Sequence, residues 1–102
     1  MEEKLELIVG REYSKGDQRQ ALYVRMVTGG AITGDGMFRF ETWKNNQEDL
    51  NLRVDSGDAY AMQRKFVMKL LDLNEDGWKR EQVRDGDPNL KQYRRYFDPG
   101  LL

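Results

Sequence analysis

Residues 20–27 read Gln-Ala-Leu-Tyr-Val-Arg-Met-Val, so that Leu22, Val24 and Met26 are separated by a tyrosine and an arginine. Successive side chains of a β-strand point to opposite faces, and this stretch therefore predicts a strand with one buried face and one face in water. Strands of this kind are typical of antiparallel sheets. The same period recurs in three further stretches, which contain Leu5, Leu7 and Val9, then Phe38 and Phe40, then Leu50, Leu52 and Val54.

Turn-forming residues separate these stretches. Ser14–Asp17 contains a glycine that can adopt positive φ, and Lys44–Asp49 is polar throughout. Between them, Thr28–Gly36 holds four glycines in nine residues, a composition too flexible for the interior of a strand. The sequence therefore predicts a four-stranded antiparallel meander, flat or curled into a partial barrel, with strands at 4–9, 20–27, 37–43 and 50–55.

Residues 59–71 have the period of a helix, and Ser56 or Asp58 can cap its first turn. The apolar positions recur three and four residues apart, at Ala59, Met62, Phe66 and Leu70, and are widened by Tyr60, Val67 and Leu71. Basic residues occupy the opposite side. The pattern therefore predicts a helix laid across the apolar face of the sheet, where it closes the core.

A second, shorter helix is expected over residues 88–97. Asp87 and Pro88 place an acidic cap before a proline at the first helical position, where proline is favourable. One side of this helix carries Leu90, Tyr93 and Phe97. No linker separates the predicted elements, so we expect a single α+β domain over residues 1–102.

The composition restricts the class of protein. The chain has 102 residues, a formal net charge of -1, and neither cysteine nor histidine. A disulfide framework and thiolate metal sites are therefore excluded. No apolar run approaches the roughly 18 residues of a membrane span, and the N-terminal Met-Glu-Glu is unlike a signal peptide. We expect a soluble, cytoplasmic protein with no membrane contact.

Asp72–Gly77 matches the first half of a calcium-binding loop, in which alternate oxygens converge on one cation before a sharp glycine turn. The second half does not match, because loop position eight is Lys79 and position twelve, a bidentate glutamate in such loops, is Val83. An acidic turn that ends a helix explains the same residues. The sequence therefore predicts no metal site here.

Two other motifs fall short of a catalytic site. Thr28–Gly36 lacks the Gly-Lys-Ser/Thr sequence of a Walker loop, and strands are expected on both its sides. Asp35, Glu41 and Lys44 approach the Asp and Glu-x-Lys set of metal-dependent nucleases, but one extra residue turns Lys44 to the other face of the strand. Without a nucleophile–base pair or a complete metal set, we expect no enzymatic activity and no cofactor.

Basic and aromatic residues are interleaved in the last third of the chain and on the polar side of the predicted sheet. From Trp78 to Phe97 there are six basic residues against three acidic ones. Aromatic rings stack on unpaired bases and guanidinium groups bind phosphate, so this mixture favours single-stranded nucleic acid. The candidate binding residues are Tyr23, Arg25, Arg39, Trp43, Arg53, Arg94, Arg95 and Tyr96.

Packing can explain part of the same pattern. Tyr93 and Phe97 could seat the last helix on the sheet over Tyr23 and Trp43, and a charge of -1 is not the strongly basic character of nucleic-acid-binding proteins. The sheet arginines could pair across strands with Glu12, Glu41 and Asp55. Two hypotheses therefore stay open for one surface. The first is a single-stranded nucleic-acid-binding accessory protein, and the second is a protein-binding inhibitor or adaptor of phage or mobile-element type.

An edge strand could also pair two copies of the chain into a homodimer. Neither 4–9 nor 50–55 contains a proline that would block such pairing.

Overall fold

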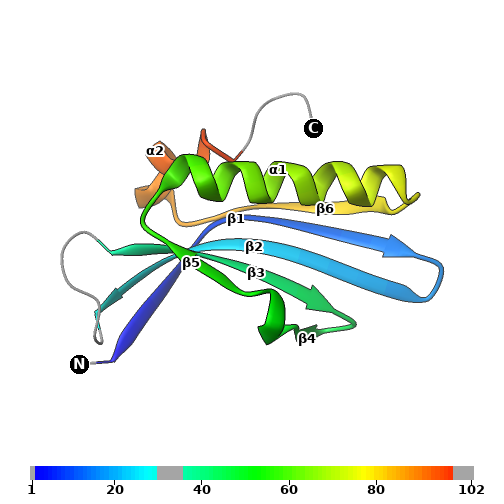
Figure 1. Ribbon diagram of the computed structural model, residues 1–102, viewed down its shortest axis with the longest axis horizontal. Coiled ribbons are helices and arrows are strands. Elements are labelled where there is room, and N and C mark those ends of the chain that lie inside the picture. Colours follow the sequence, from blue (N-terminus) through cyan, green and yellow to red (C-terminus); the bar gives the residue numbers. More distant parts are fainter. Residues whose placement is uncertain (1, 30–35, 98–102) are drawn as a thin grey trace.

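A computed structural model describes residues 2–29 and 36–97 of the chain. An antiparallel sheet carries a long helix, α1 (Ala59–Glu75), along one face, and a short helix, α2 (Lys91–Arg94), lies near the start of α1 (Figure 1). The strands are β1 (Glu3–Lys15), β2 (Gln18–Gly29), β3 (Met37–Lys44), β4 (Gln47–Glu48), β5 (Val54–Ser56) and β6 (Lys79–Asp85). Two short 3-10 helices are η1 (Leu50–Leu52) and η2 (Pro88–Leu90).

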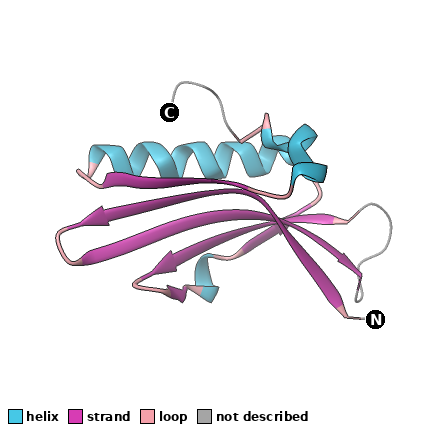
Figure 2. Cartoon of the chain, turned by 180° about the vertical axis from the view of Figure 1, so that it is seen from behind, coloured by secondary structure: helices cyan, strands magenta, loops and turns pink. Residues whose placement is uncertain are grey.

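The α+β class and the antiparallel sheet are confirmed, but the described residues form six strands rather than four and close no barrel. The strand order is β4-β3-β2-β1-β6, and β5 pairs with β3 as well. Strand β6 forms the edge beside β1 (Figure 2). All seven of its residues are exposed and only Val83 is aliphatic, so the strand has no apolar alternation by which the sequence could reveal it.

The expected edge strands are not free edges along their whole length. Val9–Ser14 pairs with β6, and the backbone N–H groups of Gly86 and Asp87 donate to the carbonyl oxygens of Ile8 and Leu7. Residues 50–52 form η1 instead of a strand. The long outer edge of the described sheet is β6, and its charged side chains disfavour pairing with another strand.

A β-bulge in β1 changes which residues face the helix. Leu7 pairs with Arg25, whereas Val9 pairs with Val24, so Ile8 is the extra residue. The prediction that Leu5, Leu7 and Val9 share one face is therefore wrong. Ile8 and Val9 are buried, whereas Leu5 is 45% exposed. Side chains alternate between the two faces of a strand only where its register with the neighbouring strand is unbroken.

The predicted strand at 50–55 is mostly wrong. Only β5 forms a strand there, and it pairs with residues 38–40 of β3. The Asp49 carboxylate accepts a hydrogen bond from the Asn51 N–H and thereby caps η1. Leu50 and Leu52 are consequently exposed rather than part of the core.

Helix α1 lies on the sheet much as its periodicity predicts. Asp58 caps it, because its carboxylate accepts hydrogen bonds from the N–H groups of Tyr60 and Ala61. The helix runs four residues beyond Leu71, to Glu75, and its buried side chains are Met62, Phe66, Leu70 and Leu73. Tyr60 and Leu71, which were expected to widen the apolar stripe, are exposed. The buried face meets Leu22, Val24, Met26, Phe38 and Phe40 of the sheet.

The C-terminal segment closes one end of this core. Asp87 caps η2 as expected, with its carboxylate accepting from the Asn89 N–H, but α2 spans only four residues instead of most of 88–97. Phe97 is fully buried, and its ring lies edge-on to Phe66 at 5.9 Å between centroids. Tyr93 meets Phe38 in the same way at 5.7 Å. These aromatic residues therefore lie on the α1 side of the sheet.

Substitution of Gly86, at the junction of β6 and η2, tests how closely this segment approaches β1. A Cβ there would lie 2.0 Å from the carbonyl oxygen of Leu7 and 2.7 Å from that of Ile8, both backbone atoms that cannot move aside easily. We expect Gly86→Ala to lower the free energy of unfolding by about 1–3 kcal/mol, measured by urea denaturation. Gly57→Ala, where a Cβ meets nothing within 4 Å, is the control. Equal stability of the two variants would contradict the close approach of this segment to β1.

Candidate functional site

The sheet face opposite α1 carries a continuous set of polar and aromatic side chains. We call it the polar face and define it by Tyr23 and Arg25 of β2 with Arg39, Glu41 and Trp43 of β3. Tyr23 lies opposite Glu41, and Arg25 lies opposite Arg39, in the β2–β3 register. These positions alternate with core residues such as Val24 and Phe40, so the face follows from the two-residue period of the strands.

Two arginines sit directly opposite each other at the centre of this face, an arrangement that is unfavourable unless each charge is compensated. The Arg25 Nε donates to the Glu41 carboxylate at 2.9 Å. The Arg39 Nε and Nη2 donate to both oxygens of Asp55, at 2.9 and 3.1 Å. These hydrogen bonds with Asp55 raise the pKa of Arg39 above its ordinary value. Of the three carboxylates expected to pair with the sheet arginines, Glu41 and Asp55 are confirmed, whereas Glu12 binds Arg84, which was not among the candidate residues.

Two more arginines are held in the same way at the margins of the face. Arg53 follows η1, outside any strand, and donates to both oxygens of Glu48 at 2.8 and 2.5 Å. Glu48 pairs with Trp43 across β3 and β4. On the opposite margin, Arg84 of β6 donates to Glu12 of β1. Four guanidinium groups thus meet four carboxylates, and the face has little net charge to offer a phosphate.

Tyr23 and Trp43 form the aromatic part of the face. Their rings meet edge-on, with centroids 6.2 Å apart and planes 81° apart. The Trp43 Nε1–H donates to Glu41 at 3.0 Å, the carboxylate that also holds Arg25. The Arg25 guanidinium lies 5.1 Å from the Tyr23 ring centroid. Both rings are therefore held in place by charged neighbours.

Gly10 makes room for the Tyr23 ring. A Cβ at this position of β1 would lie 2.8 Å from the ring carbon Cδ1, so only glycine allows the ring to approach the strand this closely. The Tyr23 hydroxyl donates to Glu12 at 3.4 Å. Burial, followed by the nearby Glu12 charge, raises the pKa of the phenol above its ordinary value. Tyr23 is consequently a neutral donor at physiological pH.

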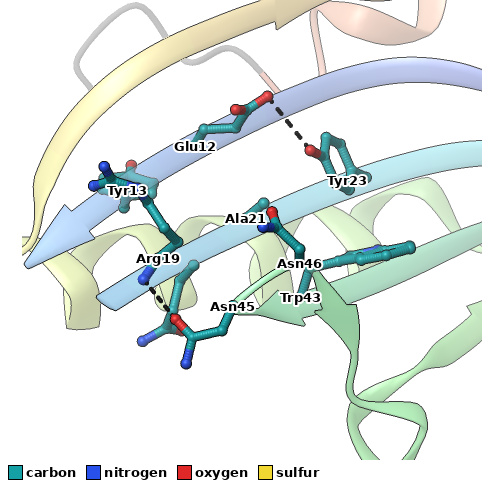
Figure 3. Close-up of a pocket in the computed structure, with 9 residues that line it drawn as sticks. Glu12, Tyr13, Arg19, Ala21, Tyr23, Trp43, Asn45 and Asn46 are labelled. Atoms are coloured by element: carbon teal, nitrogen blue, oxygen red, sulfur yellow. Dashed lines mark hydrogen bonds between the residues drawn. The ribbon is translucent and has the colours of Figure 1, made fainter. Parts of the chain in front are cut away.

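A pocket of about 200 Å³ lies beside the two rings (Figure 3). Ala21 shares the face with both aromatic residues, and its small side chain leaves the space that they border. Asn45 and Asn46, both with positive φ, form the turn at the pocket's rim, and the Asn45 side-chain oxygen accepts from the Arg19 N–H at 2.9 Å. The lining residues are Glu12, Tyr13, Arg19, Gln20, Ala21, Tyr23, Trp43, Asn45 and Asn46.

The C-terminal candidates lie elsewhere. The Arg94 guanidinium donates to the Gly86 carbonyl oxygen at 3.1 Å and so holds the end of β6. Arg95 lies 5.3 Å from the Tyr96 ring, which in turn meets Tyr60 of α1 edge-on. These three predicted residues are therefore on the helix side of the sheet and not beside the polar face. The idea that the last helix covers Tyr23 and Trp43 is wrong for the same reason.

The other sequence motifs have structural roles where they are described. Asp72–Gly77 ends α1: Gly77 has φ +83°, and the Trp78 N–H donates to the Leu73 carbonyl oxygen at 2.9 Å. Among residues 2–29 and 36–97 no three metal-ligating side chains are grouped. Lys44 pairs with Asp49 at 3.6 Å, away from the polar face. Residues 30–35 of the glycine-rich stretch, Asp35 included, lie outside the described residues.

No protein-family model, no curated protein and no solved structure matches the chain. Within the described residues, none of the helices has the length and apolar character needed to span a membrane.

Proposed function

We propose that this chain is a protein-binding module, an inhibitor or adaptor, that engages its partner through the polar face. The observation that carries the proposal is the internal compensation of charge. Arg25, Arg39, Arg53 and Arg84 each hold a carboxylate of the same chain, while Tyr23 and Trp43 remain only partly buried among them. A phosphate backbone would have to displace these carboxylates before it gained a charge-assisted contact.

Aromatic and arginine side chains are the residues that most often dominate binding energy at protein interfaces. Here they are fixed by hydrogen bonds before any partner arrives, so little side-chain entropy would be lost on binding. The adjoining pocket of about 200 Å³ offers a partner side chain a place beside both rings. Its Asn45–Asn46 rim supplies amide groups that can fix the orientation of such a side chain.

Single-stranded nucleic acid is the second candidate, and the accessible Trp43 ring favours it because bases stack on such rings. The two candidates differ in their response to salt. Nucleic-acid binding weakens steeply as salt rises, because counterions are released from the phosphates, whereas binding to a neutral face changes little.

The test uses the full chain as bait in an extract of the source organism, beside the variants Trp43→Ala and Tyr60→Ala. Tyr60 is an equally aromatic control, 62% exposed but on the helix side of the sheet. A protein captured by the wild type and by Tyr60→Ala is then purified and titrated. We expect Trp43→Ala to weaken its binding by about 30-fold or more, at low and moderate salt alike.

A labelled single-stranded oligonucleotide is titrated in parallel. Salt-sensitive oligonucleotide binding that Trp43→Ala abolishes would overturn the protein-binding proposal in favour of nucleic acid. Thermal melts of both variants verify that the fold is intact. Captured proteins that bind Trp43→Ala as tightly as the wild type would also overturn it.

A further inference from the structure

A second surface, separate from the polar face, lies where α1 meets η1. The chain between β4 and β5 leaves the sheet there, so β4 pairs only with residues 43–44 of β3 and β5 only with residues 38–40. A groove of about 390 Å³ remains between this segment and the helix, within the range of about 300–1,000 Å³ typical of ligand pockets. Its lining residues are Phe40, Thr42, Asn51, Leu52, Val54, Lys65, Met68, Lys69 and Asp72.

The groove exposes apolar side chains. Phe40 and Thr42 are buried at its floor, whereas Leu52 on one wall is 42% exposed and Met68 on the other is 64% exposed. Leu50, next to the groove in sequence, is 65% exposed. Exposed apolar groups that lie together mark interaction surfaces, and methionine adapts its flexible side chain to different partners. Covering these side chains would therefore contribute favourably to the free energy of binding.

The charges around the groove indicate what covers it. Lys65 and Lys69 lie one helical turn apart, on either side of Met68 in the sequence, and both line the groove. Among the residues that the structure describes, neither lysine forms an ion pair with a carboxylate. Asp72 is the one acidic residue of the lining. The rim is thus positively charged although the whole chain carries -1.

We propose that this groove docks a short segment of another protein in which apolar side chains stand beside acidic ones. The apolar residues of the segment cover Leu52 and Met68, and its carboxylates pair with Lys65 and Lys69. This charge complementarity sets the kind of partner and its orientation, while the apolar contacts supply most of the affinity. The proposal is independent of the polar face, which lies on the other side of the sheet.

The test selects random 12-residue peptides, displayed on phage, against the immobilised full chain. We expect the enriched peptides to combine leucine-like and aromatic residues with aspartate or glutamate. A synthetic enriched peptide is then titrated by fluorescence anisotropy. Met68→Glu, and Lys65→Glu combined with Lys69→Glu, should each weaken its binding about 10-fold or more. Arg64→Glu, a charge reversal at an exposed position of α1 outside the groove lining, should leave it within about 2-fold.

Any of the following outcomes would overturn the groove proposal. Enrichment of no peptide, or of basic peptides, would do so. Peptides that survive Met68→Glu but are lost with Trp43→Ala would place docking on the polar face, leaving the proposed function standing. Analytical ultracentrifugation of the wild type covers the remaining case, because self-association abolished by Met68→Glu would make a second copy of the chain the occupant.

Discussion

Replacing Phe66 by alanine is expected to lower the free energy of unfolding by about 3–5 kcal/mol. Phe66 is fully buried where α1 crosses the sheet. Its ring meets Phe40 at 6.0 Å and Phe97 at 5.9 Å, so it joins the helix to β3 and to the C-terminal segment at once. Truncation removes these contacts and leaves a cavity that three separate elements would have to collapse to fill. Urea denaturation followed by far-ultraviolet circular dichroism measures the change.

Met68→Ala is the matched control, since this residue lies two positions further along the same helix but is 64% exposed. Its effect should stay within about 0.5 kcal/mol. A loss below about 1 kcal/mol for Phe66→Ala would mean that the helix does not cover the sheet as described.

The parts of the fold that the sequence predicts are those where burial imposes a period. Leu22, Val24 and Met26 alternate because β2 is central and has one face against α1, and Met62 and Phe66 recur with the helical turn for the same reason. Where no face of an element is buried, the sequence shows no such period. Strand β6 is exposed at every position and forms through backbone pairing with β1, which no local pattern reveals.

Irregular backbone structure also limits what the alternation of apolar and polar residues can predict. The extra residue Ile8 places Leu7 and Val9 on opposite faces of β1, and a hydrogen bond that the Asp49 carboxylate accepts from the Asn51 N–H helps turn 50–52 into η1. Both features depend on local competition between side-chain and backbone hydrogen bonds or on the register of a partner strand. Neither changes the composition of the segment, so neither can be predicted from the alternation of apolar and polar residues.

The candidate site likewise contains residues that alternation predicts and residues that it does not. The sequence places Tyr23, Arg25, Arg39 and Trp43 on one face because they alternate with core residues, and the structure has them together. Glu48 and Arg84, which complete the charge compensation, belong to β4 and β6, the two strands that alternation does not reveal. Arg94 and Tyr96 looked like further binding residues, but long-range folding takes them to the helix side.

Glu41→Gln is expected to lower the free energy of unfolding by about 2–3 kcal/mol. The Glu41 side chain is only 4% exposed, and its carboxylate accepts from both Arg25 and the indole of Trp43. Glutamine keeps the shape but removes the charge, which leaves the Arg25 guanidinium opposite Arg39 without its carboxylate. Breaking a buried ion pair typically costs about 3–5 kcal/mol, and the 25% exposure of the Arg25 side chain reduces that cost because water can solvate it.

The same experiment separates an electrostatic role from a purely steric one. Glu75→Gln, an exposed acid-to-amide change in the last turn of α1, should stay within about 0.5 kcal/mol of the wild type. In Arg25→Met combined with Glu41→Gln, part of the loss should be recovered, with a coupling energy of at least about 1 kcal/mol, because no unpaired charge remains. Additive losses in this double-mutant cycle would contradict the pairing. Recovered stability with weakened binding of a captured partner would instead show that the ion pair orients Trp43 for binding and is not needed for folding alone.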